Sequence, residues 1–205
     1  MVSQPRQLLD RAARRETILR GAAAAFASKG YAATSMEDAA AASGITKLIV
    51  YRHFPSKEAL YDAVLERVAD QLRDQFRDRY TEGRPGLTSV AALVSVADED
   101  PAAFTLLWRH AMREPQFAEH AEGIRQRAVR AAEALLASAG VDLGASHRWA
   151  AATAVSYLIG AILEWLDEGR PSSADTLAQM LATSLPPMVL AWAAADAPGA
   201  PPANV

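Results

Sequence analysis

Apolar side chains recur three or four positions apart through most of this chain of 205 residues, the spacing of one face of an α-helix. Alanine dominates and runs of β-branched residues are scarce, which favours helix throughout. The pattern therefore predicts an all-α fold. The clearest apolar stripe consists of Leu60, Val64, Val68, Leu72 and Phe76.

Glycine and proline divide the chain into segments. Gly30, Gly44 and Pro55 separate short helices near the N-terminus, and later glycines and prolines separate longer ones. The predicted helices span about 9–28, 35–43, 46–54, 57–81, 87–97, 101–113, 115–139, 145–169 and 173–195. The predicted organisation is an N-terminal three-helix domain (1–57) after a loose arm, a helical-bundle domain (58–196) and a disordered tail (197–205).

Residues 30–60 predict a helix-turn-helix, a unit in which two short helices are joined by a turn that contains glycine. Thr34 and Glu37 have the spacing of a capping box, which would begin the first of the two helices. Gly44 lies where the chain must turn sharply, and the second helix begins near Thr46. Exposed polar and aromatic residues on that second helix would fit the major groove of DNA.

The same segment resembles the DNA-binding domain of TetR-type transcriptional regulators. The signature is a turn that reads Gly44-Ile45-Thr46, followed by Tyr51-Arg52-His53-Phe54-Pro55-Ser56-Lys57. The resemblance covers about residues 14–62. It implies a dimeric, ligand-responsive regulator, a repressor released from a palindromic operator by a small apolar or amphipathic effector.

The resemblance also implies which residues contact DNA. The second helix would face the groove, and residues around it would hold phosphates. Leu48 departs from the small or polar residue that the family often has there, and it offers an apolar contact such as a thymine methyl group. The expected DNA-contacting residues are Thr34, Ser35, Thr46, Lys47, Leu48, Tyr51, His53 and Lys57.

Net charge supports DNA binding once it is divided by position. The whole chain carries −3. Residues 1–57 hold nine Lys or Arg against four Asp or Glu, a net of +5, whereas residues 58–205 hold twelve against twenty, a net of −8. A basic N-terminal domain on an acidic body is what phosphate binding by that domain predicts.

Two further sites are expected in the body. If the family pattern holds, the middle helices enclose an effector pocket lined by Phe104, Leu107, Trp108, Met112, Phe117, Trp149 and Tyr157, although each of these residues also fits a plain core. The last two helices carry surplus apolar surface, which suggests a two-fold dimer. Its expected residues are Ile159, Ile162, Leu166, Leu181, Leu185, Val189 and Trp192. The alternative is that these helices only fill the core.

Several kinds of chemistry have no support in the sequence. Cysteine is absent, so disulfides and thiolate metal sites are excluded. His110 and Glu114 have metal-ligand spacing but no third ligand, and we expect neither a metal nor a cofactor. The start lacks a signal peptide and the apolar stretches carry charges or are short, so we expect a cytoplasmic protein without membrane contact.

Two rival functions remain open from the residues. An all-helical enzyme is one, but the chain has no Gly-x-Ser-x-Gly elbow, phosphate loop or dinucleotide fingerprint. A helical adaptor that acts through protein contacts without DNA is the other. The basic N-terminal domain and the turn signature argue against the adaptor, and salt-sensitive binding to duplex DNA would distinguish the two.

Overall fold

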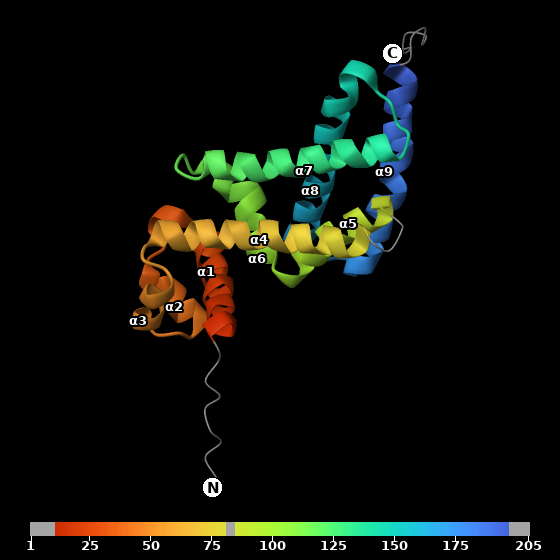
Figure 1. Ribbon diagram of the computed structural model, residues 1–205. Coiled ribbons are helices and arrows are strands. Elements are labelled where there is room, and N and C mark those ends of the chain that lie inside the picture. Colours follow the sequence, from red (N-terminus) through yellow and green to blue (C-terminus); the bar gives the residue numbers. More distant parts are fainter. Residues whose placement is uncertain (1–10, 81–84, 197–205) are drawn as a thin grey trace.

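The computed structural model describes residues 11–80 and 85–196, and this part of the chain is helical without any strand (Figure 1). The all-α prediction is therefore confirmed. The predicted N-terminal arm and C-terminal tail lie outside the described residues. So does most of the predicted break that follows residue 80.

Three helices form the N-terminal domain, which we call the head. They are α1 (Arg11–Ala33), α2 (Met36–Ser43) and α3 (Lys47–His53). Gly30 has φ 78° and ψ 165°, which bends the chain within the last turns of α1. Helix α2 packs against α1, and α3 packs against α2. Their shared core is closed by small residues, and Ala22, Ala23 and Ala39 have no exposed surface.

The longest helix, α4 (Lys57–Tyr80), leaves the head and runs across the body (Figure 1). It packs against α1 at one end and against α5 (Pro85–Glu99) along the body. Four of the five residues of its predicted stripe are buried, namely Leu60, Val64, Val68 and Leu72, whereas Phe76 is half-buried. Helix α4 is thus the continuous element that joins the head to the body.

The predicted helix 101–113 is broken into three pieces. These are α6 (Pro101–Thr105), a π-helical segment η1 (Leu106–His110) and a 3₁₀ turn η2 (Ala111–Arg113). Since a π segment holds more residues per turn, it changes which side chains face the core. The chain then enters α7 (Ala118–Ser138), which crosses the body roughly parallel to α4 in Figure 1.

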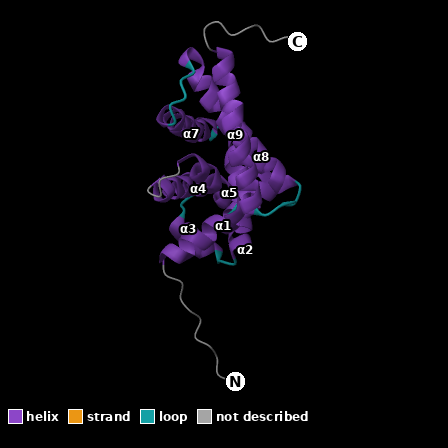
Figure 2. Ribbon diagram, turned by 90° about the vertical axis from the view of Figure 1, so that its right-hand side faces the viewer, coloured by secondary structure: helices purple, strands orange, loops and turns teal. Residues whose placement is uncertain are grey.

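A short 3₁₀ turn η3 (Gly144–Ser146) precedes the last two helices, α8 (His147–Asp167) and α9 (Ala174–Asp196). They are neighbours, and in Figure 2 they run along the side that faces the viewer. Pro186 and Pro187 lie inside α9 without ending it, although a proline lacks the amide that a helix interior uses.

Candidate nucleic-acid interface and internal cavity

The start of α2 is fixed by a capping box that is one residue later than predicted. Ser35 Oγ accepts a hydrogen bond from the Asp38 amide at 3.1 Å, and Asp38 Oδ2 accepts one from the Ser35 amide at 2.9 Å. The prediction that Thr34 and Glu37 form the box is therefore wrong. Both pairs have the same spacing, and the fold uses the second because Thr34 is turned inward.

Thr34 has an internal role. Its side chain is buried, and its hydroxyl donates to the carbonyl oxygens of Gly30 at 2.7 Å and Ala25 at 3.3 Å. The hydroxyl thus fixes the connection between α1 and α2. Our prediction that Thr34 contacts a phosphate is wrong for this side chain, whereas Ser35 is half-exposed beside it.

The turn between α2 and α3 depends on Gly44. Its φ of 64° is left-handed, and its amide donates to the Ala40 and Ala41 carbonyl oxygens, which closes α2. A second glycine brings the two preceding helices together, because a Cβ atom on Gly21 would lie 2.5 Å from the backbone nitrogen of Ser43. The helix-turn-helix is therefore built on a backbone-to-backbone contact between α1 and α2.

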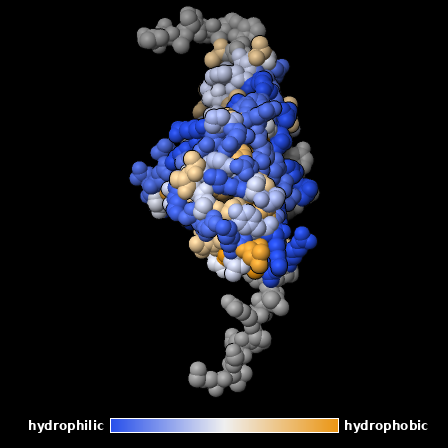
Figure 3. Space-filling model, turned by 90° about the vertical axis from the view of Figure 1, so that its left-hand side faces the viewer, coloured by the Kyte–Doolittle hydropathy of each residue, from blue (hydrophilic) through white to orange (hydrophobic). Residues whose placement is uncertain are grey.

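Helix α3 buries one side and exposes the other. Val50 has no exposed surface and Phe54, which follows the helix, is 4% exposed. On the opposite side Leu48 is 65% and Tyr51 is 44% exposed. Figure 3 looks at the side that carries α3 and shows a mostly hydrophilic surface with a small hydrophobic area toward the lower end. The predicted groove-facing residues, including Thr46 and Lys47, share this exposed face.

Lys47 already has a carboxylate partner. Its ammonium group forms an ion pair with Glu37 of α2 and lies 5.6 Å from the ring centroid of Tyr51. The hydrogen bond with Glu37 raises the pKa of Lys47, and the same bond lowers the pKa of Glu37. Lys47 must therefore leave Glu37, or share it, before it can bind a phosphate.

The other two predicted phosphate ligands lie at the two ends of the segment between α3 and α4. Lys57 donates to the carbonyl oxygen of Tyr31 at 2.9 Å, and its ammonium group lies 4.3 Å from the Tyr31 ring centroid. It thereby stabilises the carboxyl end of α1. Burial, followed by the charges of Arg11, Arg14 and Arg15, lowers the pKa of His53.

An apolar cavity of about 490 Å³ lies in the body. Its walls come mainly from α4, α7 and α8, with contributions from α5 and η1. Small side chains of α7 leave the space open. The lining residues are Ala69, Leu72, Arg73, Phe76, Ser89, Leu93, Trp108, Ile124, Arg127, Ala128, Ala131, Ala132, Ala134, Leu135, Ser138, Val155, Leu158 and Ile159.

Of the seven predicted pocket residues, Trp108 alone lines this cavity. Phe104 and Leu107 are core residues with at most 1% exposed surface, and Phe117 stacks on Tyr61 with ring centroids 4.2 Å apart. These three residues do not line the cavity, and their burial fits the alternative of a plain core.

The remaining three predicted pocket residues lie outside the cavity as well. Trp149 is 55% exposed and contacts Trp192 of α9, with ring centroids 5.1 Å apart. Met112 is 39% exposed, and the Tyr157 hydroxyl lies 2.9 Å from that of Ser184. The sequence signal that could have located the cavity is the alanine-rich stretch of α7. The prediction relied on aromatic residues instead.

The last two helices divide the predicted dimer residues into two sets. Ile159, Ile162, Leu181 and Val189 are at most 9% exposed within one chain, which fits the alternative that they fill the core. Leu166, Leu185 and Trp192 are half-buried. The large apolar residues that α9 exposes are Met180 and Leu190, each at 59%.

Windows around α8 and α9 are also long and apolar enough to span a membrane by length and composition, contrary to our expectation. They are residues Gly144–Asp167 and Ala174–Ala195. The fold buries 44% of an 18-residue apolar stretch in the first segment and 22% of the corresponding stretch in the second. The first value fits a core helix, and the second leaves much of α9 for a further contact.

Comparison with known proteins agrees with this geometry. Residues 18–64 match the family model described as "Bacterial regulatory proteins, tetR family". The HTH-type transcriptional activator FasR of Mycolicibacterium smegmatis is 28% identical over 174 residues, which are 82% of this chain and 79% of FasR.

Two solved structures share the fold. A TetR-like transcriptional regulator from Rhodococcus sp. RHA1 has a TM-score of 0.74 at 22% identity, over 89% of this chain and 98% of its own. AibR, solved in complex with isovaleryl coenzyme A and operator DNA, has a TM-score of 0.62 at 18% identity, over 83% and 97%. At these identities the likeness concerns the fold.

Proposed function

We propose that this chain, which belongs to the tetR family of bacterial regulatory proteins, is a cytoplasmic dimeric repressor that leaves a palindromic operator when a small effector enters the body. The observation that carries the proposal is that α3 has one buried side and one exposed side. One side is anchored by Val50 and Phe54, and the other holds Leu48 and Tyr51 out to solvent. A helix held in this way can enter a major groove without losing its packing.

Within the groove, each exposed residue of α3 would have its own contact. Tyr51 and Thr46 offer hydroxyl groups to base edges or phosphates, and Leu48 offers an apolar surface to a thymine methyl group. Lys47 would exchange Glu37 for a phosphate oxygen. Phosphate contacts position the head, and base contacts choose the sequence.

A second copy of the chain would double the site. One short helix reads few base pairs, and two-fold pairing places two such helices about 34–36 Å apart, one turn of DNA. We assign the pairing to the outer faces of α8 and α9, because α9 exposes Met180 and Leu190. This replaces the buried residues that we first expected there.

The cavity is the natural place for the effector. Its lining is mostly alanine, leucine and other apolar side chains, which suits an apolar or amphipathic molecule. AibR, which shares the fold, was solved with isovaleryl coenzyme A. Trp108 lines the cavity here, so tryptophan fluorescence titrated with a panel of acyl compounds should respond to a bound molecule.

The direction of regulation is part of the proposal. FasR carries the name of an activator, so activation is the second candidate. Deleting the gene and measuring transcripts beside the recovered operator distinguishes the two, because loss of a repressor raises those transcripts and loss of an activator lowers them.

The deciding experiment is selection of bound fragments from sheared genomic DNA by the purified protein. The parent should recover a palindrome that Tyr51→Ala does not recover, since loss of base contacts costs about 1–3 kcal/mol. Arg77→Ala, at an exposed position of α4, is the control and should recover the same palindrome as the parent. Recovery of nothing, or of the same fragments by all three proteins, would rule out the proposal.

A further inference from the structure

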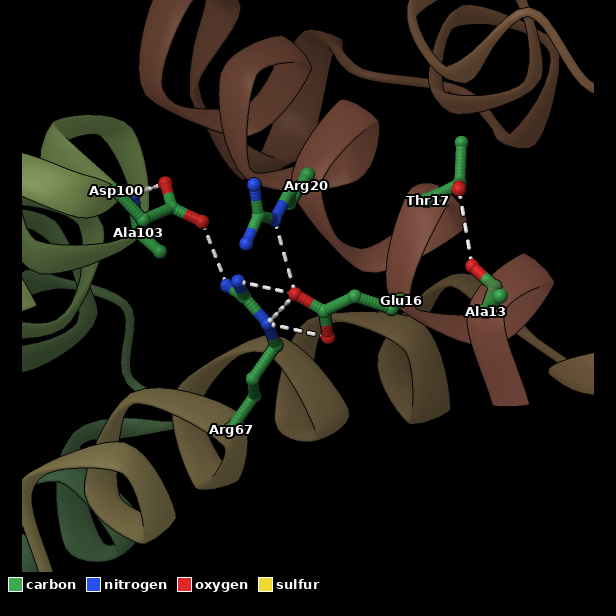
Figure 4. A network of polar contacts seen from close by, with 7 residues as sticks. All are labelled: Ala13, Glu16, Thr17, Arg20, Arg67, Asp100 and Ala103. Atoms are coloured by element: carbon green, nitrogen blue, oxygen red, sulfur yellow. Dashed lines mark hydrogen bonds and ion pairs between the residues drawn. The ribbon is translucent and has the colours of Figure 1, made fainter. Parts of the chain in front are cut away.

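One guanidinium group connects three helices where the head meets the body (Figure 4). Arg67 lies on α4, and its side chain is 6% exposed. Its Nε donates to both carboxylate oxygens of Glu16 on α1, at 2.9 and 2.8 Å. Its Nη1 donates to Asp100 Oδ2 at 2.6 Å, at the start of α6. Arg67 therefore holds a carboxylate of the head and one of the body at the same time.

Both carboxylates are fixed to their own helices. Asp100 caps α6, because its Oδ1 accepts from the Ala103 amide at 3.0 Å, and its side chain is 8% exposed. Glu16 also accepts a hydrogen bond from Arg20 of α1 at 2.9 Å. A displacement of either helix therefore moves a charged group that is bonded to Arg67. Loss of the bond to Arg67 would leave the buried Asp100 carboxylate without its cation, which is costly, whereas Glu16 is 41% exposed and keeps Arg20.

The protonation of the group agrees with these contacts. Burial alone would lower the pKa of Arg67, but the hydrogen bonds with Glu16 and Asp100 outweigh it and raise the pKa. Burial likewise would raise the pKa of Glu16, and the bonds from Arg67 and Arg20 lower it instead. Arg67 and Glu16 are therefore both charged at neutral pH.

The same two body elements form walls of the cavity. Ala69 and Leu72 of α4, which follow Arg67 within five residues, line it. So does Trp108, in the π segment that directly continues the helix capped by Asp100. A molecule that separates these walls would move Arg67 relative to Asp100, and thus relative to Glu16 in the head.

A second contact between head and body has a different character. Tyr31 of α1 meets Phe117 and Tyr61 edge-on, with ring centroids 4.9 and 5.2 Å apart. Apolar ring contacts tolerate small rotations, whereas bonds to a planar guanidinium fix direction. The aromatic contact can therefore act as a pivot while the polar one sets the angle of the head.

We propose that Arg67 is the positioning residue through which occupancy of the cavity is transmitted to the head. The inference rests on the proposed function. In this arrangement the hydrogen bonds to Glu16 connect Arg67 to α1, and the hydrogen bond to Asp100 connects it to α6. Removing either connection leaves a folded protein whose operator affinity no longer depends on whether the cavity is filled.

The test fills the cavity with a larger side chain of the protein itself, which we call the occupant. The effector therefore need not be known. Ala132→Phe places a ring on the cavity wall, and Ala128→Phe serves in its place if the first variant fails to fold. Operator affinity is measured with and without the occupant in the parent, in Glu16→Gln and in Asp100→Asn. Asparagine still caps a helix, so Asp100→Asn removes charge and keeps the cap.

In the parent, the occupant should weaken operator binding at least fivefold, the lower end of usual coupling between sites. In Glu16→Gln and Asp100→Asn the change should fall below twofold. The matched control is Asp74→Asn, which removes a carboxylate of α4 that pairs with the exposed Arg77, and it should respond as the parent does. Arg67→Lys should retain more of the response than Arg67→Met.

An equal response to the occupant in all these proteins, or no response in the parent, would overturn the inference. If the parent binds no operator, the proposed function fails, and hydrogen exchange of the α1 amides decides the inference separately. The occupant should change that exchange in the parent and leave it unchanged in Glu16→Gln. The same change in both proteins would overturn it.

Discussion

Alanine and glycine have opposite effects on packing in the head and in the body of this protein. In the head they bring backbones together, as where Gly21 lies against Ser43. In the body the alanines of α7 leave a space of about 490 Å³. At Gly21 the head therefore has no room for an added methyl group, whereas the cavity of the body has room for several. A rigid reading surface and a compliant interior are what a DNA-binding switch needs.

The largest expected effect follows from the tight contact in the head. Gly21→Ala would place a Cβ atom 2.5 Å from the Ser43 backbone, so we expect it to lower the free energy of unfolding by about 1–3 kcal/mol, the usual cost of overpacking. Denaturant unfolding measures this value. Gly123→Ala in α7 is the control, because nothing lies within 4 Å of its added methyl group. It should be neutral or stabilising, and a loss equal to that of Gly21→Ala would end the contrast.

A smaller effect is expected at the capping box. Ser35→Ala removes the acceptor for the Asp38 amide, which should destabilise the head by about 1 kcal/mol. Thr46→Ala, at the start of α3, removes a hydroxyl that makes no capping hydrogen bond and should cost less than about 0.5 kcal/mol. Thermal unfolding of the two variants is the measurement. Equal losses would show that the head is not held by this cap.

Filling the cavity should act in the opposite direction. Ala132→Leu adds apolar atoms where space exists, so we expect a gain of about 0.5–1 kcal/mol in the free energy of unfolding. Ala22→Leu makes the same change in the head, where Ala22 is fully buried, and it should destabilise. The contrast fails if the two substitutions change stability with the same sign.

The smallest effect concerns pH. Burial and the nearby arginines lower the pKa of His53 below its ordinary 6.5. As pH falls from above 6.5 toward the folded pKa, the unfolded chain takes up a proton first, so the folded protein loses stability. Melting temperatures at pH 8 and pH 5.5 should differ more in the parent than in His53→Gln. The same difference in both would mean that His53 does not contribute.

The sequence predicted the head well because its signals are local. Gly44, Thr46 and the buried Val50 lie within a few residues of one another, and their roles follow from turn and helix geometry. The error in the capping box arose because Thr34–Glu37 and Ser35–Asp38 overlap with identical spacing. Only the packing of Thr34 against the α1 carbonyl groups separates the two.

In the body, the sequence identified helices but not the direction in which their side chains point. Periodicity marks apolar residues, and in α8 and α9 the most periodic ones, such as Ile162 and Leu181, are needed inside the chain itself. The π segment changed the faces around Trp108. The cavity exists because side chains such as that of Ala132 are small. Alanines do not form the stripe of large apolar residues by which periodicity identifies a core.

The pairing of Lys47 with Glu37 has a consequence for the ionic strength at which this protein works. Each lysine that meets a phosphate releases condensed counterions from DNA, and that release makes affinity fall with salt. When Lys47 leaves Glu37 for a phosphate, the Glu37 carboxylate must take up a cation from solution. Operator binding should therefore respond less steeply to salt than the number of basic residues in the head suggests, and Glu37→Gln should steepen that response.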